Sequence, residues 1–172
     1  MFINKNILTT SNKIRICMDL AFFARKAGVK VMLIESCSGG FASSYITSLT
    51  GSSSWFEGGV VSYSNKMKQD FLGVNEKVIC DFGAVSEEVA AEMVSLPKYS
   101  KTNDVVSASI TGIAGPGGGS KEKPVGLVCF GWAGSWGVIT RVKKFAGNRN
   151  QIREQAAFYS ITCLAKEISF IL

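Results

Sequence analysis

A serine in a glycine-rich turn is the residue of this sequence best suited to act as a nucleophile. Ser36 follows a short, apolar and partly β-branched segment at 29–34, which we expect to form a buried strand. A helical pattern comes next, so the hydroxyl would emerge at the carboxyl edge of a sheet, where open α/β folds bind ligands. The backbone N–H groups of Ser38, Gly39 and Gly40 could there hold an oxyanion or a phosphate. An ordinary strand-to-helix turn with serine as its cap is an equally open interpretation.

The base that could activate this serine cannot be a histidine, because the chain contains none. This excludes Ser-His-Asp and Cys-His catalysis and histidine-ligated metal sites. Lys68 is our candidate: if Asn65 caps a short helix, Lys68 falls at its third position, where the helix dipole and any burial favour the neutral amine. Most lysines in a first helical turn are simply solvated, and Lys66, which points elsewhere, is the natural comparison. Tyr63 could orient either group or merely pack.

Cys37 is the alternative nucleophile beside Ser36. If the strand geometry persists to this point, Ser36 and Ser38 share one face and Cys37 points the other way, so we expect a buried, inert thiol. The five cysteines are odd in number, scattered and without a C-x-x-C pair. This pattern favours reduced thiols over a disulfide framework or a zinc site.

Two further features could bind an anion. The glycine-rich loop from Gly112 to Pro124 fits neither the Walker A motif nor the dinucleotide fingerprint, because a proline and a strand follow it instead of a helix. It is either a connection between two strands or a backbone wall around a small ligand. Arg149 stands at the start of the final helix, where the dipole disfavours a cation, so it either binds an anionic group or is a plain surface charge.

These residues must be positioned by alternating strands and helices. We expect one domain at 13–172 after an amino-terminal lead at 1–12, with the α/β class and a three-layer sandwich in which helices flank a mixed sheet. The expected strands are 29–34, 59–63, 104–111, 125–132 and 137–143. The expected helices are 13–27 with Gly28 as its stop, 41–49, a short helix from Asn65 closed by Gly73, about 86–96 opened by Ser86, and about 150–168.

Composition limits the cellular setting and the partners. The 172 residues are 47% hydrophobic, and no apolar run reaches the length of a membrane span or a secretory signal. We therefore expect a cytoplasmic protein without a membrane partner. The net charge of +6 attracts anions, but the basic residues are dispersed, which favours a small anion over nucleic acid.

Several motifs in order resemble one family, the CinA carboxy-terminal domains or nicotinamide-nucleotide amidases. They are ESCSGG at 35–40, YSN at 63–65 with Lys68, GAVSE at 83–87, TGIAGPGGG at 111–119 and KPVG at 123–126. The similarity runs from about Asp19 to the last helix. It implies hydrolysis of nicotinamide mononucleotide to nicotinate mononucleotide and ammonia by a Ser/Lys dyad, without metal or cofactor.

By motif position, the resemblance implies Ser36 as nucleophile and Lys68 as base, with Tyr63 in the catalytic group. The substrate-binding residues expected from it are Glu35, Ser38, Gly39, Gly40, Asn65, Thr111, Gly112 and Arg149. The chain departs from the family pattern at Ser38, where threonine is common, at Asn148, where many members have an acid, and at Gly58, where some have arginine. We also expect a homo-oligomer. Alternatives are an amidase of the same fold acting on another small amide, a catalytically silent nucleotide-binding module and, last, a nucleic-acid binder.

Overall fold

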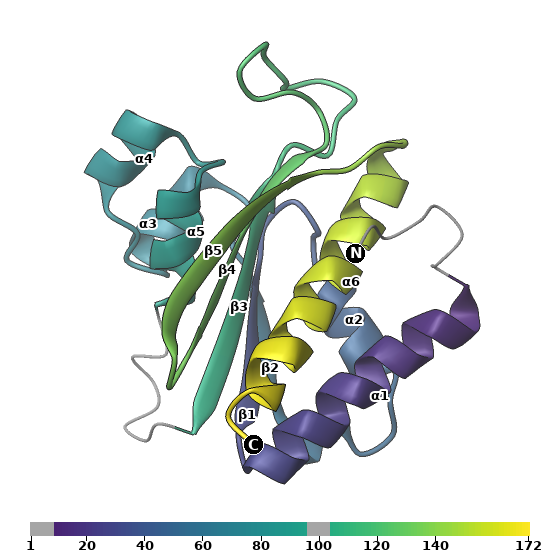
Figure 1. Ribbon diagram of the computed structural model, residues 1–172. Helices are drawn as coiled ribbons and strands as arrows, with labels where there is room; N and C mark the ends of the chain where they lie inside the picture. Colours follow the sequence, from purple (N-terminus) through teal and green to yellow (C-terminus); the bar gives the residue numbers. More distant parts are fainter. Residues whose placement is uncertain (1–8, 96–103) are drawn as a thin grey trace.

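The protein is built on one five-stranded mixed sheet. The computed structural model describes residues 9–95 and 104–172, and the strand order is β2-β1-β3-β4-β5 (Figure 1). β1 pairs in parallel with β2 and β3, whereas β4 and β5 complete the sheet as antiparallel strands. The strands are β1 (Lys30–Glu35), β2 (Phe56–Val61), β3 (Val105–Gly112), β4 (Leu127–Gly134) and β5 (Gly137–Lys144).

Helices cover both faces of the sheet. One face carries α1 (Thr10–Ala27), α2 (Phe41–Thr47) and α6 (Arg149–Ser169), and the other carries α3 (Asn65–Asp70), α4 (Glu76–Phe82) and α5 (Glu87–Val94) (Figure 1). A short 3-10 helix, η1 (Ser52–Ser54), precedes β2. Because side chains alternate along a strand, Leu33 of β1 packs into the core under α1 and α6, and Ile34 packs under α4 and α5. The predicted three-layer sandwich with a mixed sheet is confirmed.

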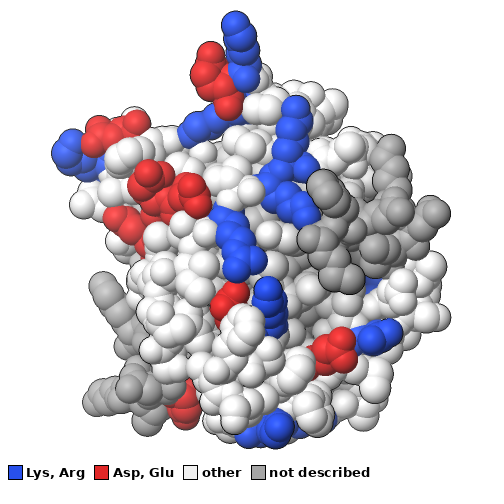
Figure 2. Space-filling view, viewed as in Figure 1, with Lys and Arg blue, Asp and Glu red and all other residues white. Residues whose placement is uncertain are grey.

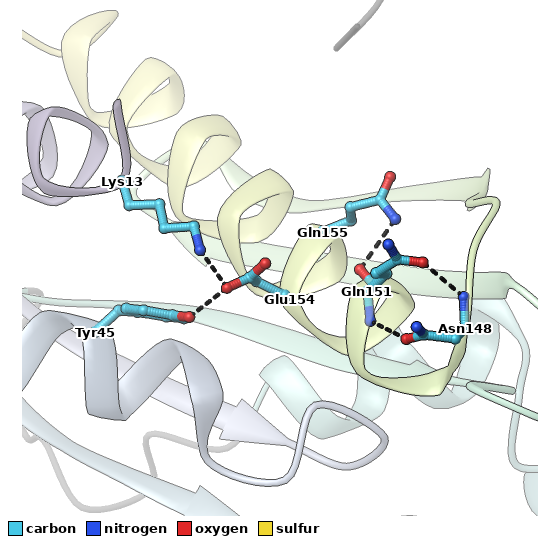
Figure 3. Close-up of polar contacts among 6 residues, drawn as sticks. All are labelled: Lys13, Tyr45, Asn148, Gln151, Glu154 and Gln155. Atoms are coloured by element: carbon cyan, nitrogen blue, oxygen red, sulfur yellow. Dashed lines mark hydrogen bonds and ion pairs between the residues drawn. The ribbon is translucent and has the colours of Figure 1, made fainter. Parts of the chain in front are cut away.

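The two long helices end as their sequences predict. Gly28 adopts a left-handed conformation after α1, and its N–H donates to the carbonyls of the last turn. At the start of α6, Asn148 and Gln151 form a reciprocal capping box (Figure 3). Asn148 is one of the departures from the family pattern, and it supplies a strong cap for the helix that carries Arg149.

Three helices of one layer are joined by a polar contact inside their interface. Glu154 of α6 accepts hydrogen bonds from Lys13 of α1 and from the hydroxyl of Tyr45 of α2 (Figure 3). The hydrogen bonds from both partners hold the pKa of Glu154 below its usual range, against burial, which acts to raise it. This contact fixes α6 relative to α2, the helix that follows the glycine-rich turn at residues 36–40.

Two expectations about local structure were wrong. Ser64, not Asn65, caps α3, because its side chain accepts from the N–H of Met67; Asn65 is the first helical residue and Lys68 the fourth. The sequence reading also missed α4, a seven-residue helix that Asn75 caps and Gly83 ends. Its apolar spacing covers barely two turns, which is too short for a clear periodic signal.

β2 begins three residues earlier than expected, and glycine explains why. A Cβ atom at Gly59 would lie 2.1 Å from the hydroxyl oxygen of Ser43 in α2. The two glycines of Phe56–Val61 weaken the strand pattern of the sequence, but here they allow a helix to approach the sheet closely. The predicted end of the helix at residue 96 lies outside the described residues.

The parallel strands deliver the candidate site to one edge of the sheet. β1, β2 and β3 all end there, and the first residues after β1 and β2 still bond to the neighbouring strand: Ser36 N–H donates to the main-chain oxygen of Ile110, and Ser62 N–H donates to that of Glu35. Within the two described segments, no helix has the length and apolar character needed to cross a membrane. The same segments contain no cluster of three or more histidine, cysteine or acidic side chains suited to a metal.

Candidate active site

Ser36 and Lys68 meet in a buried contact although they come from different layers. Ser36 follows the last residue of β1, and Lys68 lies on α3; Nζ of Lys68 donates to Oγ of Ser36 at 2.9 Å. The second partner of the amine is the main-chain oxygen of Ser62, at 2.8 Å. Lys68 is only 1% exposed and Ser36 7%. The spacing suits proton transfer between the two side chains.

Burial lowers the pKa of Lys68, and the electrostatic effect of Cys37 opposes it. Both hydrogen-bond partners of the amine are uncharged oxygens, so neither supplies the negative charge that would stabilise an ammonium ion. The result is a lysine that can lose its proton more easily than a solvated one. A neutral amine in this position can accept the proton of the Ser36 hydroxyl.

Cys37 faces away from this pair, as predicted. Its side chain is buried in the core cluster under α1 and α6. Burial raises the pKa of its thiol to about 12. A thiol with this pKa is almost entirely protonated at neutral pH and is a poor nucleophile.

The turn after Ser36 offers fewer free N–H groups to a ligand than the sequence suggests. The N–H of Gly39 donates to Ser36 O at 3.0 Å, and the N–H of Gly40 donates to the carboxylate of Glu35, also at 3.0 Å. Neither amide is therefore free to bind an oxyanion, which corrects the expectation for these two glycines. The N–H of Ser38 makes no hydrogen bond with another described residue, and the Oγ of Ser38 is also without a partner among them.

Glu35 has a structural contact in place of the expected contact with substrate. Its side chain is fully buried, and its carboxylate accepts from the N–H groups of Gly40, Ala42 and Ser43 and from the Ser43 hydroxyl. The carboxylate thus satisfies the unpaired amides at the start of α2 and complements the helix dipole. Each of its oxygens already accepts two hydrogen bonds, so neither is available to bind a ligand.

Tyr63 and Arg149 lie together at the exposed rim. One guanidinium nitrogen, Nη2, donates to the Tyr63 hydroxyl at 2.8 Å, and Nη1 donates to the carbonyl of Gly115 at 2.6 Å. The contact joins the segment after β2, the glycine-rich loop and the start of α6. Asn65 is also exposed, at the first residue of α3. The remaining donors of the arginine could bind an anionic group at this rim.

Thr111 and Gly112 shape the site from the end of β3. The Thr111 hydroxyl is nearly buried and donates to the main-chain oxygen of Ala84, which fixes the loop before α5. A Cβ atom at Gly112 would lie 2.8 Å from the carbonyl oxygen of Leu127, so glycine is needed for the two strands to approach. The contacts seen for Thr111 and Gly112 are thus with other parts of the protein, and contact with substrate stays a prediction.

Two residues of the site were missed by the sequence reading. Ser62 supplies the carbonyl that accepts from Lys68. Every residue has such a carbonyl, so the sequence gives no sign of this role. Arg153 donates from Nε and Nη2 to the Ser38 carbonyl, at 3.2 and 3.0 Å. It follows Arg149 by four residues and so shares a face of the helix with it, a spacing that could have marked both for the same site.

Sequence comparison identifies similar proteins. The sequence profile described as the CinA C-terminal domain matches residues 16–168. Two relatives named nicotinamide-nucleotide amidohydrolase PncC, from Enterobacter agglomerans and Escherichia coli K12, are 43% and 42% identical to this chain. These alignments cover 87% and 91% of this chain and 92% and 95% of the relatives.

Solved structures show the same architecture. A CinA superfamily protein from Enterobacter cloacae superposes with a TM-score of 0.85 at 29% identity, over 98% of this chain and 99% of that one. CihA from Agrobacterium tumefaciens, a competence/damage-inducible protein, has a TM-score of 0.77 at 35% identity, over 88% and 96% of the two chains. With the family profile spanning nearly the whole chain, this protein belongs to the CinA C-terminal domain family.

Proposed function

We propose that this protein hydrolyses the carboxamide of nicotinamide mononucleotide to give nicotinate mononucleotide and ammonia, with Ser36 as nucleophile and Lys68 as base. The observation that carries the proposal is the 2.9 Å contact between Oγ of Ser36 and a buried lysine amine. The substrate class comes from the relatives named nicotinamide-nucleotide amidohydrolase, which this chain matches over about nine-tenths of its length.

The first half of the reaction forms an ester. Oγ of Ser36 attacks the carboxamide carbon while the neutral amine of Lys68 takes the hydroxyl proton, which produces a tetrahedral oxyanion. The N–H of Ser38, which is free of other described partners, is our candidate donor to that oxyanion. Collapse breaks the C–N bond, and the Lys68 ammonium gives its proton to the departing ammonia.

The second half returns the enzyme to its starting state. Water attacks the nicotinoyl ester, Lys68 takes a proton from that water, and the Ser36 oxygen leaves and is reprotonated. The carboxylate of nicotinate mononucleotide is the product. We assign binding of the nucleotide phosphate to the rim, where Arg149 and Tyr63 meet and where guanidinium donors suit phosphate oxygens.

The dyad is tested by ammonia release from nicotinamide mononucleotide. Ser36→Ala and Lys68→Ala should each lower kcat by about 10⁴-fold or more, because the members of a catalytic unit fail together. Lys66→Ala is the matched control: this lysine is 82% exposed, pairs with Asp70 and should be dispensable. Full turnover by Ser36→Ala would exclude the nucleophile assignment.

The substrate is tested with a panel of pyridine carboxamides with and without ribose phosphate. We expect the wild type to hydrolyse free nicotinamide only weakly, and Arg149→Ala to raise KM for the nucleotide without changing that weak activity. Equal turnover of all carboxamides would instead indicate an amidase acting on another small amide. Thermal stabilisation by the nucleotide without ammonia release would indicate a silent binding module.

We also infer that the protein acts in the cytoplasm and forms a homo-oligomer. All five cysteines are free thiols, as expected for a reducing compartment. On the face drawn in Figure 2 basic side chains are dispersed, and acidic ones gather over α4 and α5, which disfavours a nucleic-acid partner there.

The inferred homo-oligomer is tested by light scattering coupled to size-exclusion chromatography. A monomer at micromolar concentration would contradict the inference.

A further inference from the structure

The nucleophile turn, residues 36–40, contains two consecutive glycines and few main-chain hydrogen bonds of its own. Gly39 and Gly40 have φ angles of 62° and 90°, in the left-handed region where glycine is permissive. Consecutive glycines allow the peptide planes around them to rotate at little cost. Side-chain contacts from Glu35 and from α6 therefore help to fix the geometry of Ser36 and of the free Ser38 amide.

One such contact fixes the far end of the turn, and another its middle. The carboxylate of Glu35 holds the N–H of Gly40. The peptide between Ser38 and Gly39 is held at both its polar atoms. Its N–H donates to Ser36 O, and its carbonyl accepts two hydrogen bonds from the guanidinium of Arg153, at 3.2 and 3.0 Å, and a longer one from the N–H of Phe41, at 3.4 Å. This peptide lies between the nucleophile and α2.

The guanidinium of Arg153 is itself held in place. It stacks over the ring of Phe41, 4.0 Å from the ring centroid. A Cβ atom at Gly39 would lie 2.9 Å from Nη2 of Arg153, so the glycine leaves the space that the guanidinium occupies. Among the ion pairs between described residues, Arg153 has no carboxylate partner. Its charged guanidinium instead donates to the Ser38 carbonyl of the nucleophile turn.

We propose that Arg153 is a positioning residue for the nucleophile turn: its two hydrogen bonds to the Ser38 carbonyl hold Ser36 and the Ser38 amide in the arrangement that acylation requires. The proposal rests on the proposed function for its reaction and assigns Arg153 no contact with substrate. It differs in this from Arg149, one helical turn away, whose guanidinium lies at the exposed rim. The two arginines should therefore affect different kinetic constants.

The kinetic test compares kcat with KM for nicotinamide mononucleotide. Arg153→Ala should lower kcat by about 100-fold, the cost of a misplacement of about 1 Å at a reacting group, and leave KM within about twofold. Arg153→Lys retains the charge but lacks the planar fork, and should recover less than about a tenth of wild-type kcat. Arg15→Ala, at an exposed position of α1, is the matched control and should be unchanged.

Three results would overturn the proposal. A raised KM with normal kcat in Arg153→Ala would make the arginine a substrate contact. Full activity in Arg153→Lys would show that charge alone is needed, and full activity in Arg153→Ala would show that the contact is dispensable. If Arg153→Ala does not fold, as judged by thermal unfolding, Phe41→Leu replaces it: this variant keeps the arginine, loosens its stacking and should lower kcat at unchanged KM.

A second assay separates this proposal from the identity of the substrate. p-Nitrophenyl acetate acylates an activated serine without recognition of a nucleotide, and the burst of p-nitrophenolate reports the acylation rate of Ser36. The burst should be absent in Ser36→Ala and slowed about 100-fold in Arg153→Ala. If the wild type shows the burst but releases no ammonia from nicotinamide mononucleotide, the proposed substrate is wrong and the positioning role still stands. An Arg153→Ala burst as fast as that of the wild type would refute it.

Discussion

Replacing Glu35 by glutamine should destabilise the protein strongly, although the two side chains have nearly the same shape. Each carboxylate oxygen accepts two hydrogen bonds: Oε1 from the N–H and hydroxyl of Ser43, and Oε2 from the N–H groups of Gly40 and Ala42. Glutamine offers one acceptor oxygen and one NH₂ donor. With its NH₂ toward Gly40 and Ala42, two N–H donors lose their acceptor; with its NH₂ toward Ser43, one N–H does, because the Ser43 hydroxyl can rotate and accept. In either orientation the hydrogen bonds that remain lose the negative charge of their acceptor.

The expected loss follows from counting these contacts. A hydrogen bond to a charged group contributes about 1.5–3 kcal/mol, and this is the cost of the one bond lost in the less costly orientation. The other three hydrogen bonds become neutral and weaken by about 0.5–1 kcal/mol each, so the total loss is about 3–6 kcal/mol. Proteins of this kind are stable by only about 5–15 kcal/mol, and the variant should be close to the limit of folding. With a urea m-value of about 2 kcal/mol/M, the unfolding midpoint should fall by about 1.5–3 M.

Urea unfolding followed by tryptophan fluorescence measures this loss. Glu57→Gln is the matched control, because Glu57 is exposed on β2 and its replacement should change the free energy of unfolding by less than about 0.5 kcal/mol. An unchanged midpoint for Glu35→Gln, together with a raised KM for nicotinamide mononucleotide, would refute the capping role. It would also restore the substrate contact that the sequence suggested for Glu35.

Three further predictions concern other parts of the chain. Activity should rise with pH, with a midpoint below 10.5, because burial lowers the pKa of Lys68. The free energy of unfolding should also rise with pH between the pKa of Lys68 in the folded protein and 10.5, because in this range the unfolded chain binds more protons than the folded one. A limb at or above 10.5 in the ammonia-release rate would contradict this. Iodoacetamide at neutral pH should alkylate exposed Cys80 and spare Cys37, as read by mass spectrometry of the native protein. Gly126→Ala should lower the free energy of unfolding in urea by well over 2 kcal/mol, since its Cβ would lie 2.1 Å from a main-chain oxygen. Gly73→Ala is the control: its Cβ would meet no atom within 4 Å, so only the strain of a positive φ, about 1–2 kcal/mol, should be lost. Equal losses in the two variants would show that the close contact at Gly126 relaxes freely.

Local signals in the sequence were enough to place most of the elements. Gly28 ends α1 and Ser86 caps α5 as their types suggest, because capping depends on residues a few positions apart. The error at α3 is of the same local kind: serine and asparagine are both good caps, and the choice between Ser64 and Asn65 was decided by which side chain reaches the N–H of Met67.

The contacts that define the site could not be read in this way. Lys68 meets Ser36 across 32 residues, and Arg153 meets the Ser38 carbonyl across 115. Spacing along the chain carries no information about such pairs unless the sheet topology is already known. The resemblance to a family supplied the dyad because it brought that topology with it, but it could not distinguish a residue that binds substrate from one, such as Glu35, that caps a helix.

The direction in which Glu35 points has a consequence for the base. Glu35 directly precedes Ser36, and a carboxylate turned toward Lys68 would stabilise the ammonium ion and raise the pKa that burial lowers. Strand alternation instead sends the side chains of Glu35 and Ser36 to opposite sides of the sheet, and the N–H groups at the start of α2 stabilise the negative charge of Glu35. Lys68 then has only the neutral oxygens of Ser36 and Ser62 as its hydrogen-bond partners. In a chain without histidine, the same carboxylate contact therefore both anchors the nucleophile turn and keeps an anion away from the lysine that must lose its proton.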